Sequence, residues 1–146
     1  MANYFNAGIS EVPMIADEDL SSYQWRLVMA ASTNGNVQLF DILPTAGSPR
    51  YPIGVLVNSP SLGQEASVKC LGYTKAFANV VGGCTLNWGT LLSVSNAGHF
   101  VPASQDVSDP IYGVWFGPVV TSGSVYGNVL LNMFPASGLQ ALNTTN

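Results

Sequence analysis

The sequence predicts an all-β fold, a small antiparallel β-barrel preceded by an extended N-terminal arm. Nine prolines and fifteen glycines interrupt the 146 residues too often for long helices to form. Between these breaks, turn signals recur about every 8–15 residues, the spacing that is typical of an antiparallel sandwich or barrel. Apolar and polar residues alternate in several of the intervening segments, as they do in half-buried strands.

The first 22 residues differ from the rest of the chain and are predicted to form the arm. Residues 3–14 mix aromatic residues with glycine and proline and show no sustained strand or helix period. The acidic run Asp17-Glu18-Asp19 follows, and it predicts a solvated turn or a helix cap. We therefore expect the β-barrel body to begin at Tyr23.

From Tyr23 onward the pattern is strand and turn. Asn34-Gly35 separates two strand-like segments and is a strong hairpin signal. A second hairpin is expected around residues 95–98. The expected strands are residues 24–28, 37–40, 52–57, 66–70, 91–94, 99–101, 111–116 and 125–134. The body is predicted to span residues 23–135, and residues 136–146 form a polar C-terminal tail.

The chain also contains an internal echo. A Pro-Ile-Gly-Val segment at residues 52–55 is followed by Gly63, and Pro-Ile-Tyr-Gly-Val at residues 110–114 is followed by Gly123. Each copy has the pattern of a strand, a loop with small residues and a second strand. Two copies are too few for a solenoid. We expect two similar hairpins that pack around one shared barrel.

Charge is sparse in this sequence. Eight acidic and four basic residues make up 8% of the chain, against about a quarter in an ordinary soluble domain. Four basic side chains neutralise at most about four phosphates, which argues against nucleic acid as a partner. No stretch approaches the roughly 18 apolar residues of a membrane span, and the first residues lack the pattern of a signal peptide. One acidic, soluble domain with no membrane partner is expected.

Motifs for catalysis or cofactor binding are missing from the sequence. His99 is the only histidine, and no Gly-x-Ser-x-Gly motif accompanies it. It lies beside a predicted hairpin turn, so we expect a surface or interface residue. The acidic residues near turns lack the spacing of a calcium loop, and no glycine-rich phosphate loop is present. We therefore expect a protein that is not an enzyme and has no cofactor or metal.

The two cysteines, Cys70 and Cys84, lie 14 positions apart without a metal-binding spacing. A disulfide between them is geometrically allowed. Without a secretory signal, however, two reduced and buried thiols are the expected state.

Aromatic residues are more informative. Trp25, Trp88 and Trp115 each lie in or beside a predicted strand, where core packing is the simplest role. Tyr112, Trp115 and Phe116 share one strand with almost no charge nearby, a composition that is enriched at subunit interfaces. Because a weakly charged surface associates readily, these three residues are predicted to lie in a subunit interface. No Lys or Arg follows Lys75, so residues 76–146 are expected to contribute most of that interface.

Several segments resemble a known family. Residues 19–28, DLSSYQWRLV, resemble the opening of tailed-bacteriophage head decoration proteins, which are also called capsid cement proteins. Residues 52–68, PIGVLVNSPSLGQEASV, are similar to the central block of that family, and LGYTK at residues 71–75 continues the match. IYGV at 111–114 and VLL at 129–131 resemble its closing block. The resemblance spans most of residues 20–134.

This resemblance implies a β-barrel or β-tulip protein that forms a homotrimer on the outer capsid surface of a virion assembled in the host cytoplasm. Its partner would be the major capsid protein, and its role would be to stabilise contacts between capsid subunits. The arm would then pair with a strand of the capsid protein, and three weak arms on one trimer would bind multivalently. The expected arm contacts are Asn3, Tyr4, Phe5, Ile9, Val12 and Met14.

A carbohydrate-binding β-sandwich module is the alternative function. In that case Trp88 or Trp115 would be exposed and would stack on sugar rings. The oligomeric state distinguishes the two hypotheses, because a trimer favours capsid decoration and a glycan-binding monomer favours the alternative.

Overall fold

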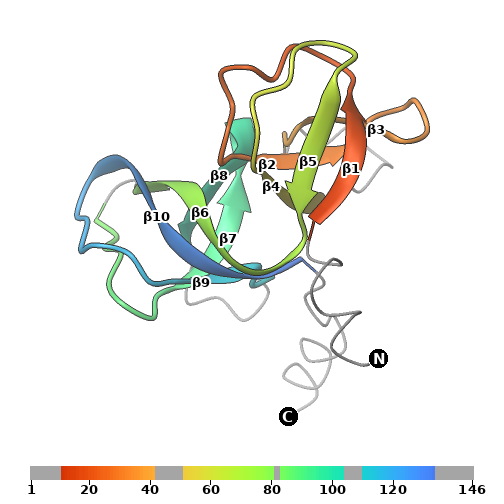
Figure 1. Ribbon diagram of the computed structural model, residues 1–146. Helices are drawn as coiled ribbons and strands as arrows, with labels where there is room; N and C mark the ends of the chain where they lie inside the picture. Colours follow the sequence, from red (N-terminus) through yellow and green to blue (C-terminus); the bar gives the residue numbers. More distant parts are fainter. Residues whose placement is uncertain (1–10, 42–50, 81–82, 104–109, 134–146) are drawn as a thin grey trace, which may run out of the picture.

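A computed structural model describes residues 11–41, 51–80, 83–103 and 110–133, which form two closed barrels of five strands each (Figure 1). The first barrel contains β1 (Glu11–Ala16), β2 (Leu27–Ala30), β3 (Asn36–Leu39), β4 (Pro52–Leu56) and β5 (Glu65–Lys69). The second barrel contains β6 (Leu71–Val80), β7 (Leu91–Ser95), the 3-10 turn η1 (Asn96–Gly98), β8 (His99–Pro102), β9 (Gly113–Trp115) and β10 (Gly123–Asn132). Within the described residues, no helix is long and apolar enough to cross a membrane.

The two barrels have the same topology. The first closes in the order β1-β3-β2-β4-β5, and the second closes in the order β6-β8-β7-β9-β10. In each barrel the first and third strands are parallel, and the other neighbours are antiparallel. The registers also correspond, because Val28 faces Gly54 in the first barrel and Leu92 faces Gly113 in the second. The chain is therefore a tandem repeat of one five-stranded unit.

Small aliphatic side chains fill the first barrel. On β5, Ala66 and Val68 are fully buried, whereas Ser67 and Lys69 are only half-buried. This alternation is the one expected for a barrel strand, whose residues point inward and outward in turn. The first core consists of Ala16, Leu20, Val28, Val37, Leu56, Ala66 and Val68.

A tryptophan occupies the corresponding space of the second barrel. Trp115 is fully buried, and its Nε1 donates a hydrogen bond to the Pro118 carbonyl at 2.9 Å. Such a bond satisfies the polar end of a buried indole. A Cβ at Gly127 would lie 2.3 Å from the ring atom Cη2, so the glycine leaves the room that the ring occupies.

The two barrels pack on each other through a shared apolar cluster. Leu27, Met29, Phe40 and Val55 of the first barrel are buried in the same cluster as the core residues of the second. They are absent from the first barrel's own core, so they lie on its outer side. Each side chain of this kind stabilises the packed state by about 1.5–3 kcal/mol.

Backbone hydrogen bonds also cross the junction between the barrels. The Phe77 N–H donates to the Trp25 carbonyl at 2.9 Å, and the Gly98 N–H donates to the Phe40 carbonyl at 3.0 Å. Trp25 has a φ of 70°, a left-handed conformation that is strained for a bulky residue. The contact with the second barrel therefore uses a strained segment of the first.

The all-β barrel prediction is confirmed, and so are the two hairpins, which correspond to the antiparallel pairs β2–β3 and β7–β8. The prediction of one shared barrel over residues 23–135 is wrong. The echoed hairpins are β4–β5 and β9–β10, and each closes a separate barrel because β5 pairs with β1 and β10 pairs with β6. Similarity between two hairpins does not reveal which strands close around them.

The predicted boundary of the arm at residue 22 is also wrong. Glu11–Ala16 form β1, which pairs with both β3 and β5, so these residues belong to the first barrel. The alternation of the strand is hidden in sequence because Pro13 interrupts it and the apolar Ile15 takes an exposed position. Residues 1–10 and the predicted tail at 136–146 lie outside the described residues.

Candidate binding surfaces

The carboxylates of the acidic run make local hydrogen bonds. Asp17 Oδ1 accepts a bond from Asn36 Nδ2 at 2.7 Å, which ties the end of β1 to β3. Asp19 Oδ1 accepts a bond from the Ser21 N–H at 3.1 Å, and hydrogen bonds from Ser21 lower the pKa of the Asp19 carboxyl. The predicted turn role is confirmed. In the described part of the chain, no group of three or more His, Cys, Asp or Glu side chains is placed to hold a metal ion.

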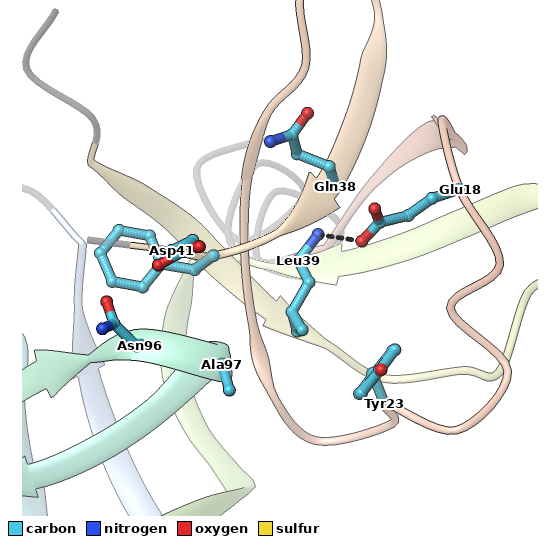
Figure 2. A pocket seen from close by; sticks show the side chains of 8 residues that line it. Glu18, Tyr23, Gln38, Leu39, Asp41, Asn96 and Ala97 are labelled. Atoms are coloured by element: carbon cyan, nitrogen blue, oxygen red, sulfur yellow. Dashed lines mark hydrogen bonds between the residues drawn. The ribbon is translucent and has the colours of Figure 1, made fainter. Parts of the chain in front are cut away.

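An open groove of about 480 Å³ lies between the end of β3 and the η1 turn (Figure 2). Its lining residues are Glu18, Tyr23, Gln38, Leu39, Phe40, Asp41, Asn96 and Ala97. Glu18 Oε1 accepts a hydrogen bond from the Leu39 N–H at 2.9 Å, as Figure 2 shows. Carboxylate and amide side chains from Glu18, Gln38 and Asn96 are part of the lining, so its chemistry suits a polar segment.

Arg26 joins the two barrels near this groove. Its Nη1 donates a hydrogen bond to the Ala97 carbonyl at 3.1 Å, and its guanidinium carbon lies 4.3 Å from the centroid of the Phe77 ring. Arg26 Nε is buried and has no hydrogen-bond partner among the described residues. The ring face of Phe77 therefore supplies part of the stabilisation of this charge.

His99 lies at the same junction. Its Nε2 is 3.0 Å from Arg26 Nη1, and its ring packs against Phe77 with a centroid distance of 4.8 Å. Burial and then the Arg26 charge lower the pKa of His99 from 6.5. A neutral imidazole accepts the Arg26 hydrogen bond, whereas a protonated one would place two cations in contact. His99 thus lies at an interface within the chain.

The predicted capsid-binding residues divide into two groups. Val12 and Met14 belong to β1, where both side chains are half-buried and Met14 packs against the first core. Asn3, Tyr4, Phe5 and Ile9 lie outside the described residues. The structure therefore removes Val12 and Met14 from the predicted arm, because strand pairing holds them in the barrel.

The predicted subunit-interface residues are also separated. Tyr112 is 2% exposed and Trp115 is 0% exposed, so both lie in the core and cannot contact another subunit. Burial raises the pKa of the Tyr112 hydroxyl. Only Phe116 remains at the surface, half-buried. Alternation decides the difference, since Trp115 points into the barrel and its neighbour in sequence points out.

Phe116 belongs to an apolar surface that the sequence did not reveal as a unit. Its ring lies 6.0 Å from the ring of Tyr73 and 4.9 Å from the ring of Trp88, which is 71% exposed. The outer apolar face, as we call this surface, consists of Leu71, Tyr73, Trp88, Leu91, Val114, Phe116 and Leu130. Patches of this kind on soluble proteins often mark interaction sites.

Strand alternation contained part of the signal for this face. In Val129-Leu130-Leu131, the middle residue must point opposite to its two neighbours, and it is 44% exposed while they are buried. The sequence did not reveal that residues on β6, β7, β9 and β10 would lie side by side. That arrangement depends on the order of strands in the closed barrel.

The two cysteines, Cys70 and Cys84, are free thiols in the structure. The expectation that both are buried is wrong. Cys84 is exposed, and Cys70 is half-buried, where desolvation raises the pKa of its thiol.

The fold has a counterpart among solved structures, although the sequence does not match known families. No protein-family model and no curated protein sequence matches the chain. Among solved structures, the fold is similar to the N base of the head fibre gp8.5 of bacteriophage phi29, with a TM-score of 0.55 and 16% sequence identity. The match covers 86% of this chain and 95% of that chain. At this identity the likeness shows a shared fold, which extends over nearly the whole of that solved chain.

Proposed function

We propose that this protein is a structural component of a bacteriophage head, which binds the outer capsid surface as a homotrimer and stabilises contacts between major capsid protein subunits. The observation that carries the proposal is the fold, which is shared with the base of a phage head fibre over 95% of that chain. The resemblance of several segments to head decoration proteins supports the same location by a separate route.

The contacts of the described residues support a binding role. Asp17 and Asp19 hold turns, and His99 packs at the junction of the barrels. The exposed side chains of the second barrel are instead aromatic or aliphatic, Trp88 and Tyr73 among them. Exposed aromatic and aliphatic surfaces of this kind favour attachment to other proteins.

The proposed capsid contact is the segment that precedes β1 and contains Asn3, Tyr4, Phe5 and Ile9. An extended segment adds a strand to an exposed sheet edge through main-chain hydrogen bonds. Three such segments on one trimer bind together with a high effective concentration, so weak single contacts give stable attachment.

Deletion of residues 1–10 tests this contact. The truncated protein keeps all of β1 and is expected to stay folded, while its binding to purified phage heads that lack the protein falls at least tenfold in co-sedimentation. A second deletion, of residues 1–14, removes most of β1 and is expected to unfold the first barrel. Binding of the shorter deletion at wild-type occupancy would show that the contact lies elsewhere. Failure of the full-length protein to bind heads would overturn the proposed function.

Carbohydrate binding stays as a second candidate because Trp88 is 71% exposed and lies beside Phe116. Trp115 is buried and cannot stack on a sugar. A glycan array with the full chain and a Trp88→Ala variant tests this function. Binding that disappears in the variant, from a monomeric wild-type protein, would favour the carbohydrate module over the head protein.

A further inference from the structure

Equivalent residues form a row across the outside of each barrel. In the first barrel the row from β2 to β1 is Leu27, Val55, Lys69 and Glu11. In the second barrel the row from β7 to β6 is Leu91, Val114, Leu130 and Tyr73. The strand pairs are the same in both rows, so the two rows occupy the same place on the repeated unit.

The two rows differ in what covers them. Leu27 and Val55 are 0% exposed, because the second barrel packs on that side of the first. Their counterparts are exposed to different degrees, Leu91 at 51% and Val114 as a half-buried residue. At this end of the row, the second barrel therefore exposes residues whose counterparts are buried where the first barrel packs on the second.

The second barrel contacts the first through Phe77, Gly98 and His99. The register identifies their counterparts in the first barrel. Ala16 pairs with Val37 in the first barrel, and Ala78 pairs with Phe100 at the equivalent place in the second. One residue earlier on each strand, Ile15 therefore corresponds to Phe77, and Asn36 corresponds to His99. Gly35 precedes β3 as Gly98 precedes β8, which makes it the third counterpart.

This set of Ile15, Gly35 and Asn36, which we call the β1–β3 edge, is exposed or half-buried. Ile15 is 41% exposed, although it is a large aliphatic residue. A Cβ at Gly35 would have no atom within 4 Å, whereas a Cβ at Gly98 would lie 2.7 Å from the Leu27 carbonyl oxygen. Each chain therefore has an exposed apolar face on its second barrel. Its first barrel has an exposed surface, the β1–β3 edge, that corresponds to the surface by which the second barrel contacts the first.

Charge favours contact between these two surfaces. Lys75 is the only Asp, Glu, Lys or Arg among the described residues of the second barrel, and it lies two positions from Tyr73 on the outside of β6. Asp17 adjoins the β1–β3 edge through its bond to Asn36. Contact between a first and a second barrel pairs the unit that holds the acidic residues with the unit that holds Lys75, whereas contact between two second barrels pairs two units that each hold Lys75.

The outer apolar face is large enough to form the centre of such a contact. Its exposed side chains sum to roughly 500 Å², if a whole aromatic side chain counts for about 150–250 Å². This value is at the upper end of the roughly 300–600 Å² expected for the largest patch on a monomer. Polar residues around the face would add to the buried area and bring it toward the roughly 800 Å² per partner of a stable interface.

We infer that copies of this chain associate head to tail, with the β1–β3 edge of one copy on the outer apolar face of the next. The inference rests on the proposed homotrimer and names the surfaces that form it. A contact between two different surfaces closes into a ring when the rotation allows it. Three copies then bury three identical interfaces and leave no uncovered face.

The first test is the oligomeric state of the full chain by size-exclusion chromatography with light scattering. Wild type is expected at three times the 15.4 kDa of one chain. Leu130→Asp on the face and Ile15→Lys on the edge are each expected to reduce the mass to that of one chain. Leu62→Asp is the matched control, because Leu62 is 67% exposed outside both surfaces, and it should keep the trimer.

Thermal unfolding checks that the variants are folded, and Leu91→Asp provides a second face variant should Leu130→Asp unfold. The decisive sample is an equimolar mixture of the face and edge variants. The intact edge of Leu130→Asp fits the intact face of Ile15→Lys, so a dimer at twice the chain mass is expected. A mixture that stays monomeric, or an Ile15→Lys variant that stays trimeric, would overturn the inference. A monomeric wild type would overturn it as well.

Head binding separates this inference from the proposed function. If wild type forms the trimer with the expected variant pattern but does not co-sediment with heads, the function is wrong and the interface stands. If wild type binds heads while the face and edge variants keep its oligomeric state, the interface is wrong and the function stands.

Discussion

The two barrels share strand order and register, yet they differ in what fills them and what covers them. Leu56 of the first barrel and Trp115 of the second occupy the same place, opposite Val68 and Val129 respectively. Space for the larger ring comes from Gly127 on the neighbouring strand. The comparison teaches that backbone pairing sets the repeated unit, while compensating changes in side-chain volume leave that unit intact.

The barrels differ still more at their surfaces. All six acidic side chains of the described residues, Glu11, Asp17, Glu18, Asp19, Asp41 and Glu65, belong to the first barrel or its loops. The described second barrel carries Lys75 alone among these charged types, with a row of apolar residues beside it. Within the described residues, the repeated fold thus has one acidic unit and one unit whose surface is largely uncharged and partly apolar.

Trp115→Ala should have the largest effect on this comparison. Removal of a buried tryptophan costs about 3–5 kcal/mol, and Leu56→Ala at the equivalent place costs about 2–5 kcal/mol. Because one apolar cluster joins the barrels, both variants are expected to lower the midpoint of a single transition in urea. Two separate transitions, with the unmodified barrel unaffected, would mean that the barrels fold independently.

Gly98→Ala is expected to have the second largest effect on stability, because Gly98 lies at the junction between the two barrels. Gly98 has a φ of 70°, and a Cβ there would lie 2.7 Å from the Leu27 carbonyl oxygen. Gly123→Ala is the matched control, with a φ of 83° and no atom within 4 Å of the added Cβ. The control should cost about 1–2 kcal/mol from backbone strain alone. Gly98→Ala should cost about 1–3 kcal/mol more from overpacking. Equal losses in thermal unfolding would contradict the tight junction.

Gly54→Ala and Gly113→Ala test whether the repeat is maintained by the same packing in both barrels. A Cβ at Gly54 would lie 2.5 Å from the Lys69 carbonyl oxygen, and one at Gly113 would lie 2.7 Å from Val129 Cγ1. Each change should cost about 1–3 kcal/mol in chemical denaturation. Gly54→Ala is expected to cost more, because a backbone oxygen yields less than a side-chain methyl group. A neutral result for either would show that the two positions are not equivalent.

His99→Asn should have the smallest effect, and its pH-dependent part is expected at acidic pH. The pKa of His99 is lowered in the folded state, so the unfolded chain binds more protons below about pH 6.5. The free energy of unfolding therefore keeps this contribution above pH 6.5 and loses it as the pH falls toward the lowered pKa. His99→Asn, which introduces the residue found at the equivalent Asn36, should flatten that part of the stability profile between pH 7.5 and 5. An unchanged slope would show that His99 does not titrate in this window.

Much of the fold could be predicted from local sequence. The Asn34-Gly35 signal correctly placed the β2–β3 hairpin, and the alternation in residues 66–70 correctly placed Ser67 and Lys69 toward the outside. The echo around Gly54 and Gly113 was a true sign of the repeat, since both glycines pack closely against the last strand of their barrel. These features depend on turns, strand period and steric room, which act over a few residues.

The binding surfaces could be predicted much less well. Trp115 and Phe116 are neighbours in sequence, but one fills the second barrel and the other lies half-buried at its surface. Val12 and Met14 read as an arm because no strand period extends through Pro13, yet pairing with β5 holds them in place. Both errors came from assigning long-range contacts on local composition.

The sequence by itself determined the all-β class, the positions of the hairpins, the repeat and the sparse, uneven charge, because these follow from residue type and short-range pattern. Only the tertiary structure decided that the chain closes into two barrels and that Leu91, Val114, Leu130 and Tyr73 meet in one row. The reason is physical. Barrel closure depends on hydrogen bonds between strands distant in sequence, and exposure of a strand residue depends on which neighbour is packed over it.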